Sequence, residues 1–172
     1  MKKKITKDLF TKEFKLTHLG YGDWLDEPDF LEFKFKGIKC CIVRIVQREP
    51  YTKEEVYFGG YLCGYILLPK DHPLYGKKFH EIDLECHHGI TYSQITEEGW
   101  LIGFDCAHSG DLVPTFEHKR NTDPKLKKIK EMYPAPEGFE KHPLFHSTYK
   151  NLDFCIKQCK LLAKQAAKMM VQ

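Results

Sequence analysis

Two short segments of the chain hold most of its histidine and aspartate chemistry. ECHHGITYS spans residues 85–93, and GWLIGFDCAHSGD spans residues 99–111. Histidine titrates near neutral pH, so two imidazoles can donate and accept protons in phosphodiester or glycosidic cleavage. A carboxylate can orient an imidazole or ligate a metal. We therefore predict His87 and His108 as an acid/base pair, with Asp105 and Asp111 orienting them.

Residues suited to an anionic ligand accompany this group. Glycine lets a ligand approach the backbone and offers amides to phosphate, threonine can bind phosphate, and an aromatic ring can stack on a base. A second segment, LLPKDHPLYGKK at 67–78, combines a shaped loop with positive charge. The predicted ligand-binding residues are Gly89, Thr91, Tyr92, His72, Tyr75 and Lys77.

Each of these residues also has a purely structural interpretation. A single strand histidine can be a hydrogen-bonded core residue, the 67–78 loop can be a solvated turn, and Cys86 and Cys106 are expected to pack as small apolar groups. The histidines and aspartates as a group favour a site, because unpaired polar groups in a buried sheet cost about 1–3 kcal/mol each. They could also hold a metal, but no HExxH-like spacing exists, and we predict neither a metal site nor a particular cofactor.

Periodicity indicates an α+β fold with a mainly antiparallel sheet of about five strands. Alternating or β-branched runs predict strands at 30–36, 38–47, 59–69, 83–93 and 100–108. Helical spacing predicts a final helix at about 149–170, N-capped by Thr148, and a short helix that begins at Asp123-Pro124. A further short helix is expected near 6–15, Pro114 is expected to close the last strand segment, and the lysines of KLKKIK are expected on a solvated helix face. The sheet and the final helix would form a single domain over residues 1–172.

Strand alternation makes a specific prediction about the histidines. Side chains along a strand point to alternate faces, so His87 and His88 would lie on opposite faces. Asp105 and His108 would also face opposite ways unless the strand ends before His108. Whether the group forms one site therefore depends on where the second strand ends.

Composition limits the class of protein. The chain has 172 residues and a net charge of +3, well below the excess expected of a dedicated binder of long nucleic acids. Seven cysteines, an odd number without a CxxC pair, indicate free thiols in a reducing compartment. The N-terminal stretch lacks the apolar region of a signal peptide, and no run approaches the 18 apolar residues of a membrane span. We expect a cytoplasmic protein without a membrane partner.

The order GY…LPKDHPLYGK…HHGITYS…GWLIGFDCAHSGD resembles a family of small proteins encoded by phages and prophages, described mainly as uncharacterised. Its members carry a P-x-GHP-x-YG loop, an HGGITY strand, a WWIGFDCAHAGD strand and a C-terminal helix. The resemblance covers roughly residues 60–114 and, more loosely, the final helix. It places His87 on the family histidine and His88 on the first family glycine; Asp71 stands for another glycine, and Leu101 for a second tryptophan.

The phage setting implies a counter-defence protein that acts on a small nucleotide immune signal. The resemblance and the His/Asp group together favour a nucleotide-binding protein that hydrolyses a phosphodiester bond. Two alternatives stay open at this point: a sponge, usually a homo-oligomer, that holds the nucleotide intact, and an inhibitor that binds a host defence protein.

Overall fold

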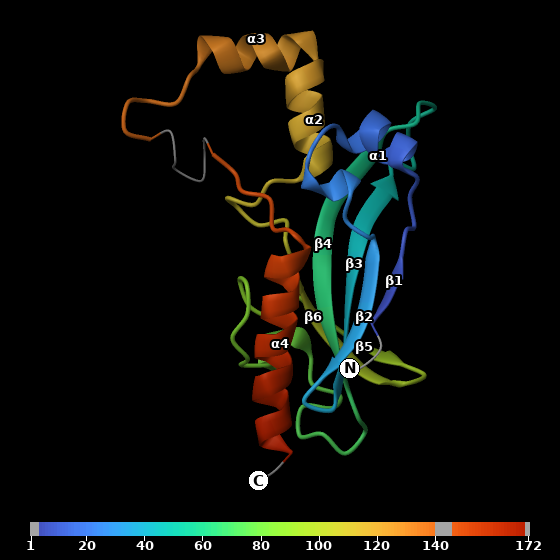
Figure 1. Ribbon diagram of the computed structural model, residues 1–172. Coiled ribbons are helices and arrows are strands. Elements are labelled where there is room, and N and C mark those ends of the chain that lie inside the picture. The colour runs from blue at the N-terminus through green and yellow to red at the C-terminus, as the bar shows by residue number, and fades with distance from the viewer. Residues whose placement is uncertain (1–3, 140–145, 171–172) are drawn as a thin grey trace.

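The computed structural model describes residues 4–139 and 146–170, and Figure 1 shows a sheet with a long helix along one face. Within these residues the strands form one six-stranded antiparallel sheet, which confirms the predicted α+β class. The strands are β1 (Ile5–Lys7), β2 (Phe30–Phe35), β3 (Ile38–Arg48), β4 (Tyr57–Leu68), β5 (Tyr92–Thr96) and β6 (Gly99–Asp105). The helices are α1 (Lys12–Leu19), α2 (Pro114–Thr122), α3 (Pro124–Met132) and α4 (Leu152–Met169), with short 3-10 turns at Asp23–Leu25 and Phe79–Glu81.

The strand order is β1-β2-β3-β4-β6-β5, so β6 lies between β4 and β5. The alternating runs correctly predicted β2, β3 and β4. β5 and β6 form a hairpin in which Tyr92 lies opposite Gly103, and Cys63 of β4 lies opposite Asp105 at the end of β6. The sheet thus places Asp105, the last residue of β6, beside β4.

The core lies between α4 and one face of the sheet. The buried stripe of α4 recurs at helical spacing and packs on alternate residues of β3, β4 and β6. The helix approaches closely at Gly64, where an added Cβ would lie 2.4 Å from the Phe104 ring and 2.7 Å from the Cys159 sulfur. Glycine at this position therefore sets the distance between helix and sheet.

Three helix predictions require correction. α4 begins at Leu152 with Asn151 as its N-cap rather than Thr148, because the Asn151 side chain accepts from the Phe154 amide. The helix expected at 6–15 is α1, which begins after the Thr11 N-cap, while residues 5–7 add a sixth strand. Pro114 does not merely close a segment, because it is the first residue of α2. The prediction of α3 after Asp123-Pro124 is confirmed.

The strand predicted at 83–93 is wrong over residues 83–91, which form a loop. Leu84 and Ile90 are buried, which gives the stretch a strand-like pattern, but its backbone is held by α4 instead of a neighbouring strand. Gln165 exchanges two hydrogen bonds with the backbone of Glu85, and the Gln158 side chain accepts from the His87 amide at 2.9 Å. α4 therefore fixes the loop that carries His87.

A buried ionic network joins the N-terminal segment to β3. The side chains of Arg44 and Asp29 are fully buried, and Arg44 Nε donates to Asp29 Oδ1 at 2.7 Å. Lys15 Nζ lies 2.8 Å from the same oxygen, while the other Asp29 oxygen accepts from the amides of Leu9 and Phe10. Every charge removed from water here has partners, as a buried charge requires.

The same network reaches the start of α4. Arg44 donates to the Gly60 carbonyl, to the Tyr149 hydroxyl and to Glu27. Glu27 also accepts from the Leu152 amide at 2.8 Å, which satisfies a free donor at the N-terminus of the helix. Burial alone would lower the pKa of Arg44, but Tyr149, Asp29 and Glu27 hold that pKa above its ordinary value. No local pattern in the sequence indicates this network.

In the part of the chain that the structure describes, no helix combines the length and the apolar character needed to cross a bilayer.

Replacing Arg44 by methionine should lower the free energy of unfolding by about 3–5 kcal/mol, because Lys15 alone then remains to balance the two carboxylates of Asp29 and Glu27. Urea unfolding followed by circular dichroism measures this change. Lys12→Met is the matched control, since its ion pair with Asp26 is exposed and should contribute little. Equal stability of the two variants would show that the network is not a stabilising element.

Candidate functional site

Five side chains meet where β6 ends, and we call His87, His88, Asp105, His108 and Asp111 the histidine cluster. β6 ends at Asp105, so the regular alternation stops before His108. The four predicted catalytic residues are therefore brought together from two loops: the turn at 105–111 and the 83–91 loop.

Asp111 is the centre of the first pair. Its Oδ2 accepts from His87 Nε2 at 2.8 Å and from the His108 amide at 3.0 Å. Its Oδ1 lies 3.5 Å from Lys150 Nζ. Only 2% of the Asp111 side chain is exposed, so this carboxylate organises its neighbours instead of facing solvent. With Asp111 ionised, His87 donates from Nε2 and keeps Nδ1 as a proton acceptor.

His108 and Asp105 form the second pair. The Nε2 atom of His108 lies 3.5 Å from Asp105 Oδ1, and Asp105 Oδ1 also accepts from the Ala107 amide. That Nε2 atom is inaccessible to solvent and makes no hydrogen bond to the residues that the structure describes. The two side chains are thus close enough for electrostatic attraction, although Nε2 of His108 makes no hydrogen bond to the described residues.

The three imidazole rings lie against one another. His87 and His108 have ring centroids 5.7 Å apart, and His88 lies 4.5 Å from His87 and 4.4 Å from His108. The prediction that His87 and His88 face opposite ways is wrong, because residues 87–89 form a turn. His88 has a φ of 53°, in the left-handed region that favours glycine. The resemblance places a glycine at this position.

A pocket of about 320 Å³ opens beside the cluster, and we call it the site pocket. His108 and Asp111 line it together with backbone of the 107–113 turn, and α2 contributes Phe116 and Arg120. This size lies at the lower end of the range for small-ligand sites, about 300–1,000 Å³. The pocket therefore combines an acid/base group, a cation and an aromatic ring.

Sequence reasoning missed Phe116, Arg120 and Lys150. The signal for the first two was available, because Pro at a first helical position predicts α2, and residues four apart then share one helix face. Lys150 precedes α4 and reaches Asp111 only because Asp111 pairs with Thr148 in an isolated bridge. That contact is long-range and left no signal in the sequence.

The predicted ligand residues of the 67–78 loop lie away from the cluster. His72 is buried, with Nε2 3.1 Å from the Ala166 carbonyl and Nδ1 accepting from the Leu74 amide. Ala166 is eight residues along α4 from Gln158, which binds the His87 backbone, so about 12 Å separates these points. Tyr75 packs against Trp100 at the start of β6, and the Lys77 carbonyl accepts from the same indole.

The other three lie beside the cluster in the chain but do not line the site pocket. The Thr91 amide donates to the Gly103 carbonyl, and the Tyr92 ring packs edge-on against Tyr65, with its hydroxyl bonded to Gln94. Gly89 has a φ of 86° and open space beside its α-carbon. Their assignment to ligand binding stays a prediction.

Among the residues that the structure describes, no group of three or more histidines, cysteines and acidic residues is arranged to hold a metal ion.

The cysteines nearest to the cluster in the chain are Cys86 and Cys106. Cys106 follows Asp105, and its sulfur lies 3.7 Å from that of Cys155 on α4. The hydrogen bond to Cys155 and burial raise the pKa of Cys106 well above the ordinary thiol range. Burial also raises the pKa of Cys41 to about 11 and that of Cys86 to about 12. These cysteines pack as neutral groups, as predicted for Cys86 and Cys106.

Comparison of the chain with models of protein families, with curated proteins and with solved structures found no match.

The φ at His88 predicts an unusual effect of glycine. His88→Gly should be more stable to urea than His88→Ala by about 1 kcal/mol, because only glycine adopts this backbone conformation without a steric penalty. His80, which is exposed and has an ordinary φ, is the control, and there alanine should be the more stable. The same order at both positions would refute the conformational argument.

The raised thiol pKa values predict slow labelling. At pH 8, below the pKa of about 11 for Cys41, thiolate should be roughly a hundredfold scarcer than for a free cysteine, and reactivity should appear only as the pH rises. Ellman's reagent measures this, with the urea-unfolded protein, in which all seven thiols should react, as reference. Rapid labelling of Cys41 or Cys86 in the native protein would contradict it.

Proposed function

We propose that the protein binds a small phosphate-bearing nucleotide in the site pocket and hydrolyses a phosphodiester bond in it. The observation that carries this proposal is the pair of histidine–carboxylate contacts, His87 with Asp111 and His108 with Asp105, whose rings lie 5.7 Å apart. Two imidazoles, each with its own carboxylate, suit proton transfer in both directions.

The residues take the following roles. A water molecule attacks phosphorus, and Nδ1 of His87 accepts a proton from that water while Asp111 holds the ring. The bond from phosphorus to the leaving oxygen breaks, and protonated His108, beside Asp105, supplies the proton for the alcohol that leaves. One phosphodiester and one water thus give one phosphomonoester and one alcohol. The exposed fractions of the two side chains, 12% for His87 and 26% for His108, leave part of each ring accessible, and at His108 this part does not include Nε2.

The pocket supplies the means of binding. Arg120 can pair with a phosphate, and Phe116 offers an exposed face on which a base can stack. The Glu117 carboxylate lies 3.6 Å from the Arg120 guanidinium and neutralises part of its positive charge. An anionic ligand with an aromatic part therefore fits this wall of the pocket better than an uncharged one.

The cellular role extends the same proposal. All seven cysteines are free, which supports a reducing compartment such as the cytoplasm. In the phage setting that the sequence resemblance implies, hydrolysis would remove a nucleotide immune signal of the host, and we extend the proposal to a homo-oligomer acting there.

The test uses purified protein with cyclic dinucleotides and ADP-ribose derivatives, analysed by chromatography and mass spectrometry before and after heat denaturation. His87→Ala and His108→Ala should each lower turnover at least a hundredfold, because each removes one proton-transfer group. His80→Ala, an exposed histidine outside the cluster, is the control and should keep full turnover.

Three other outcomes would each contradict part of this proposal. Intact nucleotide released only on heating would identify a sponge that sequesters its ligand. Full turnover in both His87→Ala and His108→Ala would remove these histidines from the chemistry. Neither altered nor retained nucleotide would leave an inhibitor of a host defence protein as the function.

A further inference from the structure

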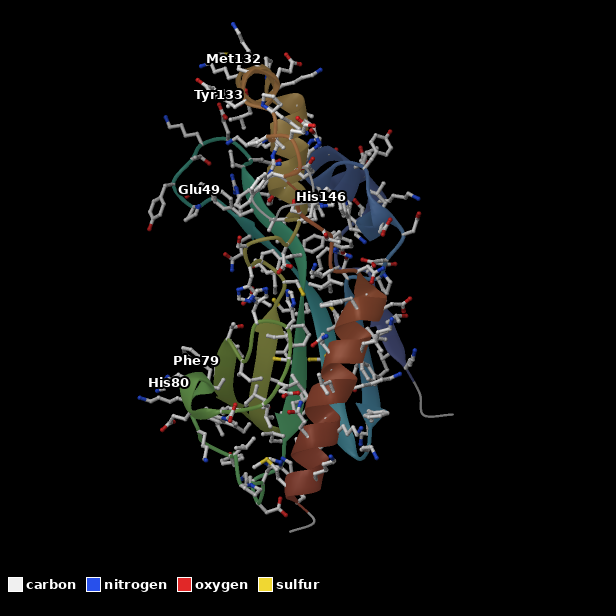
Figure 2. All side chains as sticks on the ribbon, turned by 90° about the vertical axis from the view of Figure 1, so that its left-hand side faces the viewer. Glu49, Phe79, His80, Met132, Tyr133 and His146 are labelled. Atoms are coloured by element: carbon white, nitrogen blue, oxygen red, sulfur yellow. The ribbon has the colours of Figure 1, made fainter. Side chains whose placement is uncertain are left out.

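A second cavity adjoins the site pocket on the arm formed by α2 and α3. It measures about 740 Å³, and we call it the arm groove. Phe116 and Arg120 line both cavities, so the groove adjoins the pocket that His108 lines at these two side chains. The arm extends beyond the sheet at the end of the molecule opposite the C-terminus of α4 (Figure 1). Met132 and Tyr133 lie at the outer end of the arm (Figure 2).

The apolar side of α3 is not buried. Leu126, Ile129 and Met132 recur at helical spacing, yet no residue of α3 is buried, and Ile129 and Met132 are 52% and 59% exposed. Tyr133, directly after the helix, is 71% exposed. A short helix is ordinarily stabilised by packing its apolar face, so an exposed apolar stripe on a concave surface marks a contact site. A merely solvated helix would not need this stripe.

Positive charge is concentrated on the same arm. Residues 114–133 contain six lysines and arginines against three acidic residues, an excess equal to the net charge of +3 of the whole chain. Lys119, Arg120 and Lys130 belong to the groove wall. The protein therefore has a local basic surface despite its low net charge. The groove has an apolar floor and a cationic rim.

We propose that the arm groove binds a single-stranded oligonucleotide and leads it into the site pocket. Bases would contact the apolar floor and stack on Phe116 and Tyr133, while Lys119, Arg120 and Lys130 would neutralise phosphates. The proposal rests on the proposed function for the chemistry at the histidine cluster, but the binding it describes can be measured separately. It goes beyond the proposed function by adding a surface on which a longer chain of nucleotides binds.

Continuity of the two cavities favours this ligand. An acidic amphipathic peptide would also match an apolar floor with a cationic rim, but it would not account for a groove that adjoins the pocket lined by His108 and Asp111. In a polynucleotide, each base is followed by a phosphate. Where the two cavities adjoin, Phe116 offers a ring for a base and Arg120 offers a cation for a phosphate. The ligand can therefore occupy the groove and still place one phosphate beside the histidines.

Fluorescence anisotropy with a short fluorescein-labelled RNA, and with DNA of the same sequence, tests the proposal. Three phosphate contacts predict that log K falls with log salt concentration with a slope of about −2. Tyr133→Ala should weaken binding about tenfold through lost stacking. The double change Lys119→Ala with Lys130→Ala should weaken it by at least as much and flatten the salt slope. Comparing the affinities for RNA and DNA shows whether the sugar of the strand contributes to binding.

The matched control is Lys127→Ala with Lys128→Ala, which removes the same charge from exposed positions of α3 that do not line the groove. It should weaken binding much less than the groove pair. Equal weakening by the two pairs, or an unchanged affinity in Tyr133→Ala, would overturn the groove as a site and leave a nonspecific attraction of polyanions, which heparin would reproduce. Tighter binding of an acidic helical peptide at the groove would likewise overturn it.

Binding of RNA in the arm groove and hydrolysis at the histidine cluster are tested by different results. The double variant His87→Ala with His108→Ala should leave the labelled RNA uncut but still bind it, and adding Tyr133→Ala should weaken that binding about as much as it does in the wild type. Groove-dependent binding without cleavage by the wild type would contradict the proposed hydrolysis and keep the groove. Cleavage of a cyclic dinucleotide without groove-dependent binding of RNA would do the reverse.

Discussion

A buried pair of opposite charges, Arg44 and Asp29, is the interaction on which the arrangement of the rest depends. Burial of either charge alone would be prohibitive, so the segments that supply their partners must all be present at once. Those segments are the N-terminal region, the first residues of β4 and the start of α4. Tyr149 belongs to this network and Lys150, the next residue, lies against Asp111, so the ionic core and the histidine cluster share one stretch of chain.

The sequence predicted the parts of the fold that local pattern determines. β2, β3 and β4 alternate over long runs, and Asp123-Pro124 carries its own helix start. The 83–91 segment misled the same reasoning, because its buried residues are spaced like those of a strand, whereas its backbone partners are glutamine side chains of α4. Nothing within the segment indicates a partner so distant in the chain.

The candidate site shows the same division. Residue type alone selected His87, His108, Asp105 and Asp111, and the structure brings these four together. Which carboxylate serves which histidine could not be predicted, since it depends on the turn that follows β6 and on where Asp105 ends the strand. The wall with Phe116 and Arg120 was missed because Pro114 was interpreted as an end of structure, when it is the start of a helix.

The order of the strands has a consequence for how the protein folds. Contacts that hold the cluster and the ionic network join distant parts of the chain: His87 binds Gln158 across 71 positions of sequence, and Glu27 of the network binds Leu152 across 125. Each such contact must first overcome the entropy of closing a long loop, so contacts of this kind form after the hairpins of the sheet. The histidine cluster is therefore a late product of folding. An intermediate with an intact β2–β3–β4 meander and an undocked α4 would hold the correct residues without an assembled site.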